Sequence, residues 1–284
     1  MTTIRILTLL AVAGLVCGSA MATVRTFQPD DGIWGDRFNW LPDDDYPKEG
    51  DTAIIPIYKR CRVEDDDQAA RIIQVYGTLG LVGHDLELNS TLTSTIDHIL
   101  YFKEADGHVP ELHFIAGHWL EGSGTITAKR DDGYGPGVIA GRVAGPYTSL
   151  VIESGLTVTG SILVRNLWLI HRGDFIVNHA DDEMQLELDI PFRPASKLSG
   201  DGAIQVSAGK LHVGALAIYA SATVSFRLSG GEMKFVGEPS IDAQVPFTVT
   251  GGVLDIQKDL RTSGASVFRN ATIKVKQGKA AEFY

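Results

Sequence analysis

Cysteine is scarce in this sequence. Only Cys17 and Cys61 occur in 284 residues, and Cys17 lies in a segment that we expect to be removed. One remaining cysteine excludes an internal disulfide, so burial and backbone pairing must hold the fold together. Long apolar runs are also missing after residue 22, where none approaches the roughly 20 residues that a membrane helix needs. We therefore expect no membrane span.

The first 22 residues have the layout of a signal peptide. Arg5 supplies the positive charge, Ile6 to Val16 form a short apolar core, and Gly18 to Ala22 are mostly small residues that end in A-x-A. We expect cleavage after Ala22 and a secreted protein, extracellular or at the cell surface. The alternative is lipid attachment at Cys17, but bulky residues precede that cysteine where lipid-modified cysteines usually follow a small one.

The charge of the remaining chain is strongly negative. Of the 25 Lys and Arg residues only Arg5 lies in the leader, which leaves 24 against 35 Asp and Glu and a formal charge of −11. Such a charge repels nucleic acid and anionic lipid. It also gives no electrostatic reason to bind an acidic polymer unless a cation bridges the two.

Short alternating runs occur nearly everywhere after the leader, and no segment keeps a period of 3.6 over three turns. Each run places apolar side chains on one face and ends in Gly, Asp, Asn or Ser, which tolerate sharp turns. The chain is therefore predicted to be all-β. The clearest runs are Gln74–Tyr76, Leu86–Leu88, Thr157–Thr159, Gln185–Leu188, Ala203–Val206, Lys210–Val213 and Thr223–Leu228.

Internal repetition separates the two all-β architectures that remain, a sandwich and a solenoid. Three short patterns recur at offsets of 78, 91 and 154 residues, starting at Leu120 and Leu198, at Thr157 and Thr248, and at Gly77 and Gly231. These offsets fit multiples of a coil of roughly 22 to 26 residues. We therefore predict a right-handed parallel β-helix, with a cap and first coils in residues 23–83 and further coils of the same domain in 84–284.

The stretch 31–83 carries an ordered series of landmarks. They are Trp34, Asn39-Trp40, Pro47, Gly50-Asp51, Ile54-Ile55-Pro56 and Gly77-Thr78-Leu79. This order resembles the opening of G8-type domains and of bacterial secreted parallel β-helix proteins. The resemblance covers under a quarter of the mature chain and implies that this stretch begins a β-helix and caps its first coil.

Two tryptophans stand at the centre of this opener. Trp34 and Trp40 each offer a large apolar area with which to cover the open end of a first coil. The alternative is that the pair forms an exposed platform for stacking sugars. We expect the structural role.

Four acidic clusters are the most visible polar feature. Carboxylates on neighbouring coils hold Ca²⁺ in β-helix lyases, and a pair of carboxylates flanks the scissile bond in glycosidases. None of the clusters has the fixed spacing of a recognisable calcium loop, so we expect solvated loops and no cofactor, with Ca²⁺ as the possible exception. The clusters are Asp43–Asp45, Asp65–Asp67, Asp131-Asp132 and Asp181–Glu183.

The densest mixture of base, cation and acid follows the apolar run Leu167–Ile170. If a catalytic site exists, we place it here, with His171 or Arg172 as base or as partner of an acidic sugar and with Asp181 and Asp182 as acid or metal ligands. The alternative is a polar loop between coils. The G-H-G and R-x-K signatures of polygalacturonase-like β-helices are missing from the sequence.

Two further groups of residues were considered as binding sites. His108, His113 and His118 recur every five residues, a spacing that alternates sides along a strand, so we do not expect a shared zinc site. Aromatic residues along one side of a β-helix would suit a carbohydrate. The candidates are Trp119, Trp168 and Tyr219.

Three functions remain open at this point. The leading hypothesis is a secreted non-enzymatic β-solenoid that acts as a structural, surface or adhesion element, with polysaccharide or other cell-surface components as its candidate partners. The first alternative is a polysaccharide lyase or glycoside hydrolase of the β-helix type. The second is a carbohydrate-binding module, which buried aromatics would count against.

Overall fold

The computed structural model describes residues 22–283 except for 44, 131, 143–147, 189–196, 215–216, 219–223, 237–239 and 242–244. Strands make up 53% of the chain and helix 1%, which confirms the all-β prediction. The expected leader, Asp44, Asp131 and Tyr219 lie outside the described residues. No helix in the described part has the length and apolar character that a bilayer crossing needs.

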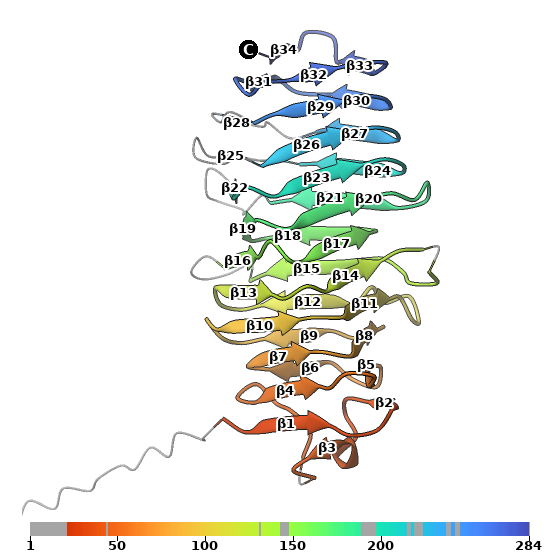
Figure 1. Ribbon diagram of the computed structural model, residues 1–284, viewed down its shortest axis with the longest axis vertical. Helices are drawn as coiled ribbons and strands as arrows, with labels where there is room; N and C mark the ends of the chain where they lie inside the picture. Colours follow the sequence, from red (N-terminus) through yellow and green to blue (C-terminus); the bar gives the residue numbers. More distant parts are fainter. Residues whose placement is uncertain are drawn as a thin grey trace, which may run out of the picture.

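The strands form three long sheets (Figure 1). Each sheet runs along the axis on which successive turns of the chain are stacked. Apart from β3 beside β1, neighbouring strands in each sheet differ by three in chain order, so each turn of the chain adds one strand to every sheet. All described pairs within the stack are parallel except one, in which β3 lies antiparallel to β1. This topology is consistent with the predicted parallel β-helix.

Sheet 1 consists, in spatial order, of β3 (Trp40–Leu41), β1 (Val24–Phe27), β4 (Thr52–Ile55), β7 (Ile72–Val75), β10 (Thr93–Ile96), β13 (His118–Glu121), β16 (Ser149–Ile152), β19 (Trp168–His171), β22 (Lys197–Ser199), β25 (Ala217–Ile218) and β28 (Ser240–Ile241). Sheet 2 consists of β2 (Asp31–Ile33), β5 (Arg60–Val63), β8 (Thr78–Val82), β11 (Ile99–Lys103), β14 (Thr125–Ala128), β17 (Thr157–Gly160), β20 (Asp174–Val177), β23 (Ala203–Val206), β26 (Ser225–Leu228), β29 (Phe247–Val249) and β32 (Val267–Phe268).

Sheet 3 consists of β6 (Gln68–Ala70), β9 (Leu86–Leu88), β12 (Glu111–Phe114), β15 (Gly137–Gly141), β18 (Ile162–Arg165), β21 (Glu183–Glu187), β24 (Lys210–Val213), β27 (Glu232–Phe235), β30 (Val253–Ile256) and β33 (Thr272–Val275). The remaining elements are a short two-stranded pair and a 3-10 turn. The pair is β31 (Leu260–Thr262) with β34 (Ala281–Phe283), and the turn is η1 (Arg37–Asn39).

Inward-facing side chains of successive turns stack into columns that form the core. One column in sheet 2 is apolar and fully buried through eight consecutive strands. Each such side chain contributes roughly 1.5–3 kcal/mol to folding relative to exposure. The column contains Leu79, Leu100, Ile126, Val158, Phe175, Ile204, Phe226 and Phe247.

The turns are less uniform than the repeats indicated. Thr78 pairs with Ile99, Ile99 with Thr125, Thr125 with Thr157 and Thr157 with Asp174, which are separations of 21, 26, 32 and 17 residues. The predicted coil length of 22 to 26 residues is therefore too narrow, because the loops at the corners between strands differ in length.

Of the three recurring patterns, the first places equivalent residues in one column, since Ile126 and Ile204 align through Val158 and Phe175. The third pattern does not, because Leu79 lies in sheet 2 and Met233 in sheet 3. A glycine followed by alternating apolar residues marks a strand in any sheet of this fold.

The two opener tryptophans are fully buried at the N-terminal end of the stack. Their rings meet edge to face with centroids 5.0 Å apart, and Trp40 packs in the same way on Phe27 at 5.2 Å. The indole N–H of Trp40 donates to the carbonyl oxygen of Trp34 at 2.8 Å, and that of Trp34 donates to Pro47 at 3.3 Å. A sugar-stacking platform at this pair is therefore wrong.

Candidate functional site

His171, the first of the predicted catalytic residues, lies inside the stack. Its imidazole is fully buried and packs on Phe175 with ring centroids 4.3 Å apart. Nε2 lies 3.1 Å from the carbonyl oxygen of Ala203 on the next turn. Because a carbonyl only accepts, Nε2 must carry the proton. Burial lowers the pKa of His171 to about 4, so the ring is neutral at physiological pH.

The other three predicted residues lie in different surroundings. Arg172 points outward and pairs with Glu153, Nη1 to Oε1, at 3.0 Å. Asp181 is exposed, whereas Asp182 is buried and its Oδ1 lies 3.4 Å from the hydroxyl of Ser161. His171 thus faces the core from sheet 1, while the two aspartates precede β21 of sheet 3.

The acidic clusters and the spaced histidines were the other predicted metal-binding features. Within the described ranges no group of three or more His, Cys, Asp or Glu side chains is arranged to hold a metal ion. The three histidines occupy three separate environments and do not meet. His108 contacts Asp85 at 3.0 Å, His113 faces Glu87 at 3.7 Å, and buried His118 bonds Ser94 Oγ at 2.8 Å.

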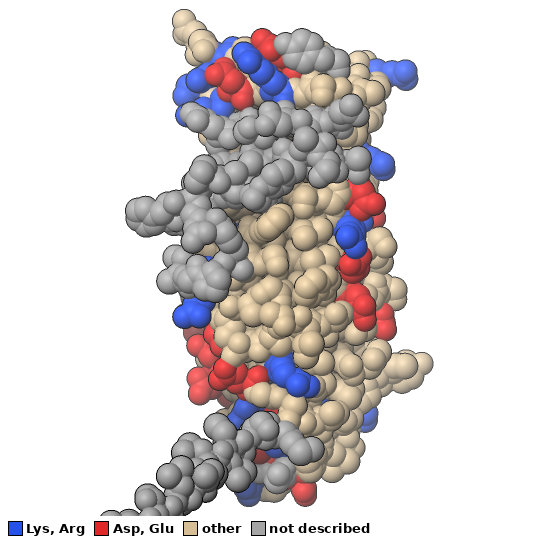
Figure 2. Space-filling view, turned by 90° about the vertical axis from the view of Figure 1, so that its left-hand side faces the viewer, with Lys and Arg blue, Asp and Glu red and all other residues tan. Residues whose placement is uncertain are grey.

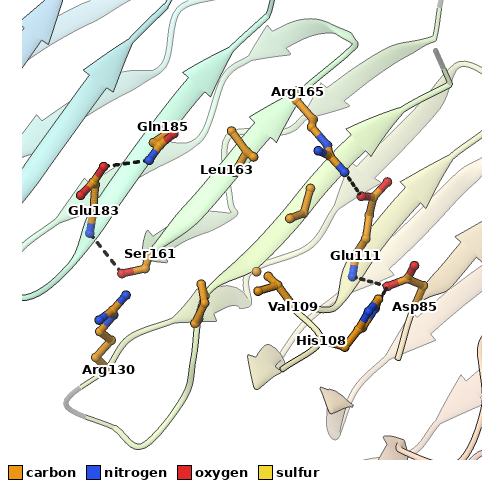
Figure 3. Close-up of a pocket in the computed structure, with 13 residues that line it drawn as sticks. Asp85, His108, Val109, Glu111, Arg130, Ser161, Leu163, Arg165, Glu183 and Gln185 are labelled. Atoms are coloured by element: carbon orange, nitrogen blue, oxygen red, sulfur yellow. Dashed lines mark hydrogen bonds and ion pairs between the residues drawn. The ribbon is translucent and has the colours of Figure 1, made fainter. Parts of the chain in front are cut away.

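A hollow of about 570 Å³ lies on the outer side of sheet 3, across β12, β15, β18 and β21 (Figure 3). Val109, Val138 and Leu163 supply apolar surface, and charged side chains stand around it. No sequence motif marks this hollow, because its residues come from separate turns of the stack. The charged and polar lining residues are Asp85, His108, Glu111, Arg130, Ser161, Arg165, Glu183 and Gln185.

The acidic groups of this hollow are already engaged. Arg165 Nη2 lies 2.6 Å from Glu111 Oε2, and Asp85 accepts from the backbone N–H of Glu111 at 2.8 Å as well as contacting His108. Glu183 accepts from the Gln185 amide at 2.7 Å. The hydrogen bond that the imidazole of His108 donates to the Asp85 carboxylate raises the pKa of His108. The contacts of Glu111 with Arg165 and with Asp85 join different turns of the stack, whereas the contact between Glu183 and Gln185 lies within β21.

The separation of Glu111 and Glu183 also bears on catalysis. They lie on β12 and β21, three strands apart, which is roughly 14 Å at the usual spacing of parallel strands. The two carboxylates of a glycosidase lie about 5 to 10 Å apart. This pair is therefore too widely spaced to flank one glycosidic bond.

The outer face of sheet 1 has a different character. The outward side chains of β10, β13, β16 and β19 include one charged residue, Glu121. Figure 2 views the side of the stack where sheet 1 lies, and its broad middle part carries no Lys, Arg, Asp or Glu. The other outward residues are Thr93, Thr95, Trp119, Ser149, Val151, Trp168 and Ile170.

Two of the three predicted aromatics share this face. Trp119 is 41% exposed and pairs with Val151, which pairs with Ile170, while half-buried Trp168 pairs with Ser149. The two tryptophans are thus two strands and two residues apart, roughly 10 Å across the sheet and 7 Å along it. This face carries indole rings and short hydroxyl side chains, and Glu121 is the one charged residue among the outward side chains of these four strands. Such a surface suits the faces and hydroxyl groups of a neutral sugar chain.

Comparison with family models, curated proteins and solved structures found no match to this chain.

Proposed function

We propose that this protein is a non-enzymatic right-handed parallel β-helix that acts outside the cell as a surface or adhesion element and binds a neutral polysaccharide on the outer face of sheet 1. Residues 23–83 supply the cap and first coils, and residues 84–284 continue the same domain. The proposal joins the structural and carbohydrate-binding hypotheses.

The observation that carries the proposal is the exposure of Trp119 in an uncharged row. Thr93, Trp119, Val151 and Ile170 are consecutive rungs on β10, β13, β16 and β19. An indole that is 41% exposed on a regular sheet leaves part of its apolar area in contact with water, and stacking on a sugar would bury that area. The negative net charge favours a neutral ligand over an acidic one.

Two features favour binding over cleavage. The base predicted for a catalytic role, His171, has its proton on a nitrogen that bonds Ala203 inside the core, away from any polymer outside. The carboxylates at the sheet 3 hollow are held by ion pairs or backbone donors. A lyase or hydrolase needs an accessible base or a suitably spaced acid pair.

Export is part of the proposal and has its own test. N-terminal sequencing of the protein recovered from outside the producing cells is expected to start at Thr23. A protein retained inside with Met1 intact would contradict export. A lipid-linked N-terminus at Cys17 would replace free secretion with membrane anchoring.

The experiment that tests the function incubates the protein from Thr23 onward with hydroxyethyl cellulose, mannan and polygalacturonate, with and without calcium. Bound protein and polymer chain length are followed together. We expect binding to at least one neutral polymer without shortening. Shortened chains would establish an enzyme. If the protein neither binds nor shortens any polymer, only a structural role would remain.

A further inference from the structure

The C-terminal end of the stack exposes residues that belong to core columns. Ile273 and Val275 on β33 pair with Leu254 and Ile256 on β30, which are fully buried. Yet Ile273 is 41% and Val275 43% exposed, because no described strand covers them. Val267 on β32 is 43% exposed as well, but it pairs with exposed Thr248 and so belongs to the outer face of sheet 2. Apolar core positions and strand edges therefore face solvent together, which makes this end a surface ready for pairing.

This end is also basic, although the protein as a whole is acidic. Residues 257–284 hold six Lys and Arg against Asp259 and Glu282, a net charge of +4 in a chain of net charge −10. Lys279 pairs with Asp259 at 3.6 Å and Arg261 with Glu282 at 3.1 Å. Figure 2 shows Lys and Arg side chains gathered at this upper end of the stack. The other basic residues are Lys258, Arg269, Lys274 and Lys276.

The N-terminal end has the opposite charge and its own exposed apolar groups. Residues 24–67 hold twelve acidic and six basic residues, a net charge of −6. Phe38 on η1 is 69% exposed and Leu41 on β3 is 51% exposed. Among the described strands, β2 pairs with β5 alone and so forms the N-terminal edge of sheet 2. β32 forms the C-terminal edge of the same sheet.

We propose that the basic C-terminal end of one copy docks on the acidic N-terminal end of a second copy. Opposite net charges favour this head-to-tail arrangement, whereas two C-terminal ends would repel each other. Contact covers Ile273 and Val275 with apolar groups such as Phe38. A head-to-tail interface uses two different surfaces, so each added copy offers a new end and the assembly grows as a filament.

Sedimentation velocity of residues 23–284 over a range of concentrations, in low and high salt, tests this proposal. We expect species larger than dimers that grow with concentration, and an association constant at least tenfold lower in high salt because screening weakens the charge attraction. A protein that stays monomeric throughout would overturn the proposal. So would monomers that bind heparin, because the basic end would then serve an acidic polymer.

Variants that weaken the charge attraction identify the two ends. Lys274→Glu with Lys276→Glu takes residues 257–284 from a net charge of +4 to 0, and Phe38→Lys with Asp43→Lys takes residues 24–67 from −6 to −3 and removes the exposed ring of Phe38. Each variant is expected to lower association at least tenfold. The matched control is Lys103→Glu on the exposed side wall, which should assemble normally. Circular dichroism confirms that each variant is folded. Unchanged assembly of the two end variants would contradict the proposal.

Discussion

The imidazole of His171 donates a hydrogen bond to the backbone of Ala203 on the following turn, with 3.1 Å between Nε2 and the carbonyl oxygen. The ring fills a core position and joins sheet 1 to the start of β23 in sheet 2. A residue that looked like a catalytic base from its neighbours in sequence thus supports the interior of the stack.

This burial predicts that stability falls as the solution becomes acidic. The pKa of His171 drops from 6.5 to about 4 because burial disfavours the charged ring, and Asp174 and Asp201 offset this only in part. Between these pH values the unfolded chain binds a proton that the folded chain does not, so folding free energy is lost as pH falls, by about 3 kcal/mol in full. Urea unfolding at pH 7.5, 5.5 and 4.5 measures the loss.

The matched variant for this prediction is His171→Gln, which keeps a donor for Ala203 and does not titrate. Its stability is expected to depend less on pH over the same interval. His108 acts in the opposite direction, because its pKa is raised and its contribution grows as pH falls. Equal pH dependence in the wild type and in His171→Gln would show that the buried imidazole is not the source.

The N-terminal tryptophans predict a large stability difference between two neighbouring aromatic positions. Trp40→Ala removes a fully buried ring and its hydrogen bond to Trp34, and is expected to cost about 3 to 5 kcal/mol. Phe38→Ala, two residues earlier but 69% exposed, is expected to cost under about 1 kcal/mol. Thermal or urea unfolding compares them, and similar costs would place the tryptophan outside the core.

Cys61 is expected to be chemically inert in the folded protein. It is fully buried on β5, and burial raises the pKa of its thiol well above the usual value. Ellman's reagent is expected to label it only after urea is added. Rapid labelling of the native protein would mean that the first coils open readily.

The ion pair at the sheet 3 hollow predicts a small effect. Arg165 is 42% exposed, so Glu111→Gln is expected to cost no more than about 1 kcal/mol despite the 2.6 Å contact. The same variant is expected to bind the neutral polysaccharide as tightly as the wild type. If the wild type cleaved a polysaccharide and Glu111→Gln did not, the hollow would instead be identified as a catalytic site.

Alternation in the sequence was enough to predict much of the fold. Ala203–Val206 and Lys210–Val213 were predicted as strands and are β23 and β24. The same rule also carries information on His171: counting by twos from Leu169 places it on the inward side, and counting back from Met184 does the same for Asp182. Reading the polar cluster as one site overlooked that its members alternate between core and surface.

What alternation does not supply is the alignment of one turn with the next. Turn lengths of 17 to 32 residues break any fixed period, so the sequence does not show that Trp119 and Trp168 share a face or that Glu111 meets Arg165. The shared face and the ion pair both depend on how many residues each corner loop contains. The excess of Lys and Arg in the C-terminal segment, by contrast, can be counted in the sequence. Only the structure shows that this segment lies at the end of the stack, where β33 is the edge strand among the described strands of sheet 3.

The most direct test of the central proposal measures the affinity of the Trp119→Ala variant for the neutral polymer that the wild type binds. Tyr58→Ala is the matched control, since Tyr58 is 95% exposed but lies at the turn between β4 and β5, away from the row. We expect at least a tenfold loss of affinity for Trp119→Ala and none for Tyr58→Ala, with polymer length unchanged throughout. Equal affinity of Trp119→Ala and wild type would contradict binding on the outer face of sheet 1.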